Sequence, residues 1–274
     1  MSFSNFTGAL RAYPCNIPPY VIPEHIRVPE YFKTAGCLAG QALDIAKRMM
    51  QPGVRTEDID LAIYNFIIEQ NAFPSPINYY GFPKASCISV NEVVCHGIPD
   101  GLVLCDGDVV NVDVTVYFCG MHGDFNQTFV VGDVSIAAAK TLCCAYAALK
   151  RALEVCRPGT PFKEIGRTIE STCREFGCSI VREYTGHGCG ELFHSKPYVR
   201  HYCVESDKSV MEKGQVFTIE PMVNAGTAKV ARWPDQWTVV TKDGKVSAAF
   251  ERTLAITDNG YKILSSYDEQ DDSP

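Results

Sequence analysis

The feature that most constrains the fold of this 274-residue sequence is a weak internal repeat. A helical pattern over residues 31–50 is followed by Pro52-Gly53. A second, over residues 135–156, is followed by Pro158-Gly159, so that the two Pro-Gly pairs are 106 residues apart. Because structural repeats bury a continuous core by packing together, we expect two pseudo-symmetric halves within one domain rather than two domains.

The repeat continues beyond each Pro-Gly pair. A further helical pattern follows in both halves, with isoleucines at the i, i+4 spacing of a buried face: Ile59 and Ile63, then Ile165 and Ile169. Strand-like segments come next, at residues 107–113 and 214–220, and their offset of 107 residues superposes Asp113 on Glu220. Each half is therefore expected to run helix, helix, strand, with acidic residues at equivalent places.

Composition narrows the classes of partner. The chain has 25 Lys and Arg against 32 Asp and Glu, a net charge of −7, which argues against nucleic acid as the main partner. Carboxylates are instead the side chains that bind hard divalent cations. No apolar run approaches the ~18 residues of a membrane span, and residues 1–5 lack the order of a secretory signal. The 13 cysteines include no Cys-x-x-Cys pair, so we expect reduced thiols and a cytoplasmic protein.

The ends of the chain differ from its middle. Residues 1–34 are expected to form an extended arm, rich in proline: Pro14, Pro18, Pro19, Pro23 and Pro29. Residues 266–274 read as an acidic, flexible tail. The single domain is therefore expected to cover residues 35–265.

A hairpin brings two acidic residues together in the first half. Residues 109–117 alternate as a strand, a turn is expected near residues 118–120, and a second strand returns from Asp124. Asp113 should then lie opposite or diagonal to Asp124, within ~4.5–8 Å. Two carboxylates facing each other among apolar side chains require either a proton or a cation between them. The alternative is a pair of surface aspartates flanking a turn, but Asp113 lies in a Val-Asp-Val run where Asp is disfavoured.

The second half supplies matching groups. Glu220 ends a strand pattern, and Glu251 lies in an apolar run whose overlay on residues 126–129 places Asp124 on the same strand face. His187 is flanked by glycines that expose its ring. Mixed oxygen and nitrogen donors suit Mn, Fe, Co or Zn, and five such residues could bind two metals ~3.5–4 Å apart.

These residues match a known family. The matching stretches are residues 74–84 and 89–100, the spacing of Asp113 and Asp124, Gly186-His-Gly188 with Leu192-Phe-His194, residues 217–222 and residues 247–253. Over residues 35–265 the chain resembles the type 1 methionine aminopeptidases of peptidase family M24, in their eukaryotic form. The resemblance implies an α+β pita-bread fold, with two pseudo-symmetric halves around a dinuclear metal site.

The resemblance also assigns roles to residues. It implies five metal ligands: Asp113, Asp124, His187, Glu220 and Glu251. It implies that His96 and His194 hold the scissile amide and the tetrahedral intermediate, and that Glu220 moves a proton. It implies that the methionine side chain is bound by Pro76, Tyr79, Phe82, Cys87, Phe193 and Trp237, beside His96 and His194.

The implied activity is removal of N-terminal methionine from nascent proteins and peptides with a small second residue, by a metal-activated water or hydroxide. The metals would be two divalent ions among Co, Mn, Fe and Zn. The resemblance implies a monomer without a membrane partner and is compatible with contact with the ribosome. Two alternatives remain: another pita-bread metallopeptidase of the prolidase or aminopeptidase P kind, and a non-catalytic pita-bread binding protein.

The chain departs from the family pattern in several places. Arg252 replaces the usual His after Glu251, and strand alternation should point it away from the metals. Ala249 replaces the usual Gln, and residues 224–232 are unlike those of relatives, so we expect an altered pocket rim. The paired cysteines of the eukaryotic zinc-binding extension are absent, so any ribosome contact should use another surface.

Overall fold

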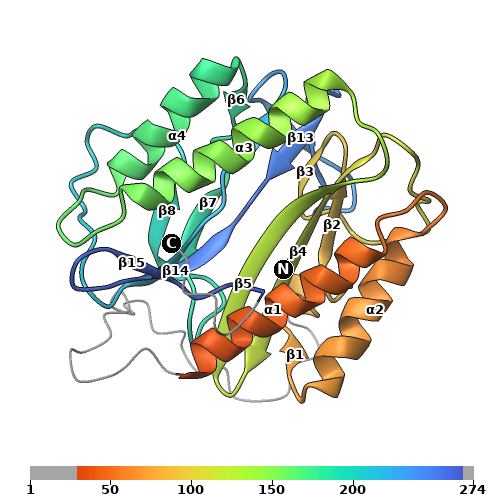
Figure 1. Cartoon of the computed structure of the whole chain (residues 1–274), viewed down its shortest axis with the longest axis horizontal. Coiled ribbons are helices and arrows are strands. Elements are labelled where there is room, and N and C mark those ends of the chain that lie inside the picture. The colour runs from red at the N-terminus through yellow and green to blue at the C-terminus, as the bar shows by residue number, and fades with distance from the viewer. Residues whose placement is uncertain (1–29, 268–274) are drawn as a thin grey trace.

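The computed structural model describes residues 30–267 and places two pairs of helices over two sets of strands. The helices are α1 (Glu30–Arg48), α2 (Thr56–Glu69), α3 (Ile136–Glu154) and α4 (Lys163–Phe176). In Figure 1 the α1–α2 pair lies over the strands of the N-terminal half, at lower right, and the α3–α4 pair lies over those of the C-terminal half. The expected helix-helix-strand order of both halves is confirmed.

The N-terminal half is built on one long hairpin. Its strands are β1 (Phe73–Pro74), β2 (Cys87–Val90), β3 (Val93–Cys95), β4 (Val109–Phe118) and β5 (Met121–Val130). β4 pairs with β1 and β2 on one edge and with β5 on the other. Cys119 and Gly120, with φ of 47° and 90°, form a two-residue turn between β4 and β5 at the predicted place. β5 begins at Met121, three residues before the expected start at Asp124, because the tight turn lets the ladder continue to its end.

The C-terminal half is divided among shorter strands. These are β6 (Ser179–Ile180), β7 (Thr185–Gly188), β8 (Ser195–Arg200), β9 (Val216–Ile219), β10 (Met222–Asn224), β11 (Val230–Arg232), β12 (Val239–Thr241), β13 (Ser247–Ala249), β14 (Arg252–Ile256) and β15 (Tyr261–Ile263). They form the sheets β13-β10-β6, β15-β14-β9 and β7-β8. β12 pairs with β11 and with β3 of the N-terminal half. The end of the segment 224–232, which is unlike the same segment of relatives, therefore belongs to a sheet that connects the two halves.

Each half has its own apolar core beneath its helix pair. One buried cluster includes Leu43 and Ile59, and the other includes Ile165 and Phe217. All four repeat isoleucines are fully buried, so the i, i+4 spacing marks the faces that pack on the strands. At about 25 cal/mol per Å² of buried apolar surface, these faces stabilise the helices far more than propensity does.

The C-terminal segment crosses α1 at two glycines. A Cβ atom at Gly36 would lie 2.1 Å from the carbonyl oxygen of Leu264, and one at Gly40 would lie 2.1 Å from that of Ser266. Any side chain at these two positions would therefore push the segment away. Ser266 is buried, and the Tyr267 hydroxyl donates to the Gln127 side chain.

This crossing corrects the expected boundaries. Residues 266–267, expected as the start of a flexible tail, pack on α1, and residues 30–34, expected in the extended arm, form the first turns of α1. The remainder of the arm and of the tail lies outside the described residues. No helix in the described part of the chain is long and apolar enough to cross a membrane.

Candidate active site

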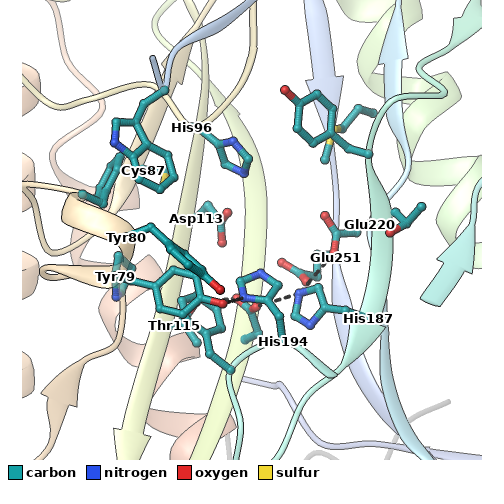
Figure 2. A pocket seen from close by; sticks show the side chains of 18 of the residues that line it. Tyr79, Tyr80, Cys87, His96, Asp113, Thr115, His187, His194, Glu220 and Glu251 are labelled. Carbon is teal, nitrogen blue, oxygen red and sulfur yellow. Dashed lines mark hydrogen bonds and ion pairs between the residues drawn. The ribbon is translucent and has the colours of Figure 1, made fainter. Parts of the chain in front are cut away.

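A single cavity of about 350 Å³ between the two halves collects the side chains that the sequence singles out (Figure 2). All thirteen predicted site residues line it: Pro76, Tyr79, Phe82, Cys87, His96, Asp113, Asp124, His187, Phe193, His194, Glu220, Trp237 and Glu251. In Figure 2, Asp113 and His96 from the N-terminal half face Glu220 and His187 from the C-terminal half. The cavity has an acidic side and an aromatic side.

The β4–β5 hairpin places the first two acids. Asp113 pairs with Asn126 and Asp124 pairs with Thr115, so the two aspartates are diagonal neighbours on one sheet face. Of the two predicted placements, opposite or diagonal, the structure has the diagonal one. Asp124 is only 4% exposed, and Oδ1 of Asp113 is one of two buried side-chain atoms without a hydrogen-bond partner among the described residues.

The C-terminal half adds three groups at irregular points of its strands. His187 lies at a bulge of β7, Glu220 follows the end of β9, and Glu251 lies between β13 and β14. His187 Nε2 is 3.5 Å from Asp124 Oδ2 and 3.5 Å from Glu220 Oε1. Ligand atoms of Asp124, His187 and Glu251 all lie within 4.8 Å of one another, a spacing that suits a metal ion.

Three polar side chains hold these acids in place. Thr115 Oγ1 donates to Asp124 Oδ1 at 2.8 Å, and Asn126 Nδ2 donates to Glu251 Oε2 at 2.9 Å. Thr218 Oγ1 donates to Glu220 Oε1 at 3.0 Å. None of the three was predicted from the sequence, although the overlay of the halves aligns Asn126 with Glu251, and Thr115 shares a strand face with Asp113.

Burial disfavours the ionised form of these acids unless a positive charge lies nearby. Burial raises the pKa of Asp113 to about 6. Burial and the neighbouring carboxylates raise the pKa values of Asp124, Glu220 and Glu251 well above the ordinary range. The unpartnered Asp113 oxygen and this concentration of carboxylates fit a divalent cation, which would replace the protons.

The histidines of the cavity are neutral near pH 7. Burial lowers the pKa values of His187 and His96 to about 4. Burial and the adjacent imidazoles also lower the pKa of His194, whose Nδ1 is 2.9 Å from the Tyr79 hydroxyl. A neutral imidazole has a free nitrogen lone pair for a metal and an N–H for a substrate oxygen.

The aromatic side of the cavity forms an apolar cup. Phe82 and Trp237 meet edge to face with ring centroids 5.1 Å apart, and Tyr79 packs against Phe193 at 4.8 Å. A short 3₁₀ turn, Tyr79–Gly81, presents Tyr79, and its helical rise is interrupted by the left-handed Tyr80 (φ 47°). His122, absent from the predicted set, stacks on the ring of Phe193, with ring centroids 5.5 Å apart.

The structure shows where the residues that depart from the family pattern lie. Arg252 points away from the cavity, as predicted: its guanidinium carbon is 4.0 Å from the Phe125 ring centre, and Nη1 donates to the Glu251 carbonyl at 2.7 Å. The Ala249 carbonyl accepts from Asn111 Nδ2 at 3.1 Å. Arg232, in the unusual segment, hydrogen-bonds the Tyr184 side chain, whose ring meets His96 edge-on at the cavity rim.

Comparison with known proteins agrees with this geometry. The model of metallopeptidase family M24 matches residues 30–258. Methionine aminopeptidase 1 of Saccharomyces cerevisiae is 49% identical over 84% of this chain and 60% of its own length. Methionine aminopeptidase 1 of Dictyostelium discoideum is 42% identical over 95% of this chain and 78% of its own.

A solved structure gives the same result. The crystal structure of methionine aminopeptidase from Rickettsia prowazekii has 41% sequence identity and a TM-score of 0.84, over 85% of this chain and 95% of that chain. The chain spans 60% of the length of its yeast relative. By sequence and by its pita-bread fold, the chain belongs to metallopeptidase family M24, among the methionine aminopeptidases.

Proposed function

We propose that this protein is a methionine aminopeptidase, which hydrolyses the first peptide bond of peptides that begin with methionine and have a small second residue. One observation supports this most directly: a single cavity of about 350 Å³ has an aromatic cup on one side and a cluster of buried acids with a histidine on the other. The free α-amine of the first residue would bind on the acidic side of this cavity, which favours an exopeptidase over an endopeptidase.

The aromatic side of the cavity is suited to a methionine side chain. A thioether makes favourable contacts with aromatic rings, each about 0.3–1.5 kcal/mol, and its unbranched chain fits between Phe82, Trp237 and Phe193. Burial raises the pKa of the Cys87 thiol well above its usual range, so Cys87 acts as a small apolar surface rather than as a nucleophile. A β-branched side chain would be too wide at its base for the same cup.

The acidic side of the cavity would hold two divalent ions, drawn from Co, Mn, Fe and Zn. The ligands would be Asp113, Asp124, His187, Glu220 and Glu251. When bound, such ions lower the pKa of water toward neutrality and polarise a carbonyl group. The unpartnered Asp113 oxygen and the neutral His187 are the features of this chain that fit them.

The remaining side chains would handle the peptide and its protons. His96 and His194, both neutral, would donate to the carbonyl oxygen of the first peptide bond and to the negative charge that develops on it. Glu220 would accept a proton from the attacking water and pass it to the leaving amine. Pro76 and Tyr79 would complete the wall that fixes the peptide.

Further features follow from the same proposal. The substrates would include nascent chains in the cytoplasm, and the enzyme would act as a monomer that contacts the ribosome. Co-sedimentation of the purified protein with ribosomes checks this contact.

The function is tested by comparing the cleavage of different peptides. With added Mn²⁺, the protein should release methionine from Met-Ala-Ser and leave Ile-Ala-Ser intact. Discrimination by a pocket of this kind is typically about 10- to 200-fold per misfitted methylene. Faster cleavage of an Xaa-Pro peptide would instead favour the prolidase alternative, and no cleavage of either would favour a binding protein.

A further inference from the structure

Glu220 lies where the strand ladder stops. β9 ends at Ile219, and Pro221, which follows Glu220, has no N–H to donate. The Glu220 N–H donates instead to Nε2 of His201, at 3.1 Å. A buried backbone N–H without an acceptor is costly, so this imidazole replaces the missing strand partner.

His201 lies behind the cavity and does not line it. It follows the last residue of β8, is 1% exposed, and is absent from the cavity wall. Since Nε2 is the acceptor, the ring proton must be on Nδ1.

Thr218 holds the carboxylate of the same glutamate. Its hydroxyl donates to Glu220 Oε1 and accepts the backbone N–H of His187, each at 3.0 Å. This double contact requires β7 and β9 to approach closely, which Gly186 allows: a Cβ atom there would lie 2.2 Å from the Thr218 carbonyl oxygen. One fully buried hydroxyl therefore connects two of the proposed metal ligands.

We propose that His201 and Thr218 are positioning residues for Glu220, with His201 fixing its backbone and Thr218 its carboxylate. The inference rests on the proposed function, in which Glu220 is both a metal ligand and the group that moves a proton. Such a group must be held within about 0.5 Å of its working position. Side chains that orient metal ligands typically contribute about 10- to 100-fold in metal affinity or activity.

The test compares apolar and conservative substitutions in the full chain. His201→Leu removes the acceptor, whereas His201→Gln keeps a carbonyl oxygen at similar reach. Thr218→Val removes the hydroxyl, whereas Thr218→Ser keeps it. Two quantities are measured for each: the affinity for Mn²⁺ alone, by calorimetry, and kcat and KM on Met-Ala-Ser.

Thr56→Val is the matched control. Thr56 is 2% exposed, and its hydroxyl also accepts a backbone N–H, that of Asp100 at 3.0 Å, outside the cavity wall. It therefore reports what the loss of a buried hydroxyl does to folding alone. Melting temperature is followed for all five variants.

The expected result is a loss of Mn²⁺ affinity of about 10- to 100-fold in H201L and T218V, a matching fall in kcat with little change in KM, and recovery to within a few-fold in H201Q and T218S. T56V should bind Mn²⁺ as the wild type does. Wild-type Mn²⁺ affinity and kcat in H201L or T218V would overturn the proposal, as would equal losses in H201L and H201Q.

Two further outcomes are separable. If H201L does not fold, T218V against T218S decides, because valine and threonine have the same shape. If the wild type binds Mn²⁺ but releases no methionine, the proposed function fails, and the Mn²⁺ affinities still decide whether the two residues position Glu220.

Discussion

The two halves of the molecule share one plan but deliver their charged groups differently. The N-terminal half presents Asp113 and Asp124 on a regular hairpin of two ten-residue strands, where side-chain direction follows from alternation. The C-terminal half presents His187, Glu220 and Glu251 at a bulge, a strand end and a strand break. On a regular strand ladder, few additional contacts are needed to set the direction of a side chain. At the irregular points of the C-terminal half, contacts from Thr218, His201 and Asn126 hold the acidic residues in position.

The largest expected effect tests whether the two halves contribute equally to the proposed metal site. Asp124→Ala, from the hairpin, and His187→Ala, from the bulge, should each reduce methionine release by at least about 100-fold, because each removes a proposed metal ligand. Release from Met-Ala-Ser is measured beside circular dichroism. Near-wild-type turnover in either folded variant would contradict the two-metal arrangement.

A smaller loss is expected where the substrate, and not the metal, is contacted. His96→Ala should lower kcat by roughly 100-fold, the effect of removing one donor to a developing oxyanion. Its Mn²⁺ affinity should stay near that of the wild type, because His96 is not among the proposed ligands. A variant that lost Mn²⁺ binding would place His96 with the metal ligands instead.

The acid cluster should also make the metal-free protein sensitive to pH. Asp113 has a folded pKa of about 6 against an ordinary 3.8, and the pKa values of the other three acids are raised well above their ordinary range. A folded pKa above the unfolded one means that the folded state holds more protons, so the contribution of these acids to stability falls as pH rises from about 4 through 6 and above. The lowered pKa values of buried histidines such as His96 and His187 act in the opposite sense below about pH 6.5, where an unfolded imidazole is protonated, so the effect of the acids dominates only above about pH 7.

Melting temperature measured in a chelator between pH 7 and 9 should therefore fall as pH rises. Added Mn²⁺ should flatten this slope by replacing the protons. A chelated protein that is more stable at pH 9 than at pH 7 would be inconsistent with raised pKa values in the cluster.

The smallest effect is expected at the departure closest to the metal ligands. Arg252→His restores the usual residue of the family, but position 252 points away from the cavity, so kcat should change less than about threefold. The lost contact with the Phe125 ring should cost about 0.5–1 kcal/mol in the free energy of unfolding. Chemical denaturation and peptide assays separate the two effects, and a tenfold change in kcat would show that position 252 reaches the active site.

The difference between the halves also decides what could be predicted. Helix pairs, the hairpin turn and the diagonal aspartates depend on periodicity over short stretches, and all were predicted correctly. The roles of Thr218 and His201 depend on contacts across 31 and 19 residues, to His187 and Glu220, which no local pattern records. The aromatic cup was found only through family resemblance, since its walls come from separate loops.

The crossing of the C-terminal segment over α1 has a consequence for how the chain acquires its structure. Gly36 and Gly40 belong to the first helix, and their partners Leu264 and Ser266 are among the last residues described; the Cys37 thiol donates to the Tyr267 carbonyl across 230 positions. Contacts of such separation slow folding, because a long loop must close before they form. During synthesis, α1 leaves the ribosome long before its covering segment. An enzyme proposed to trim other nascent chains therefore cannot complete the packing of its own first helix until residues 264–267 have been translated.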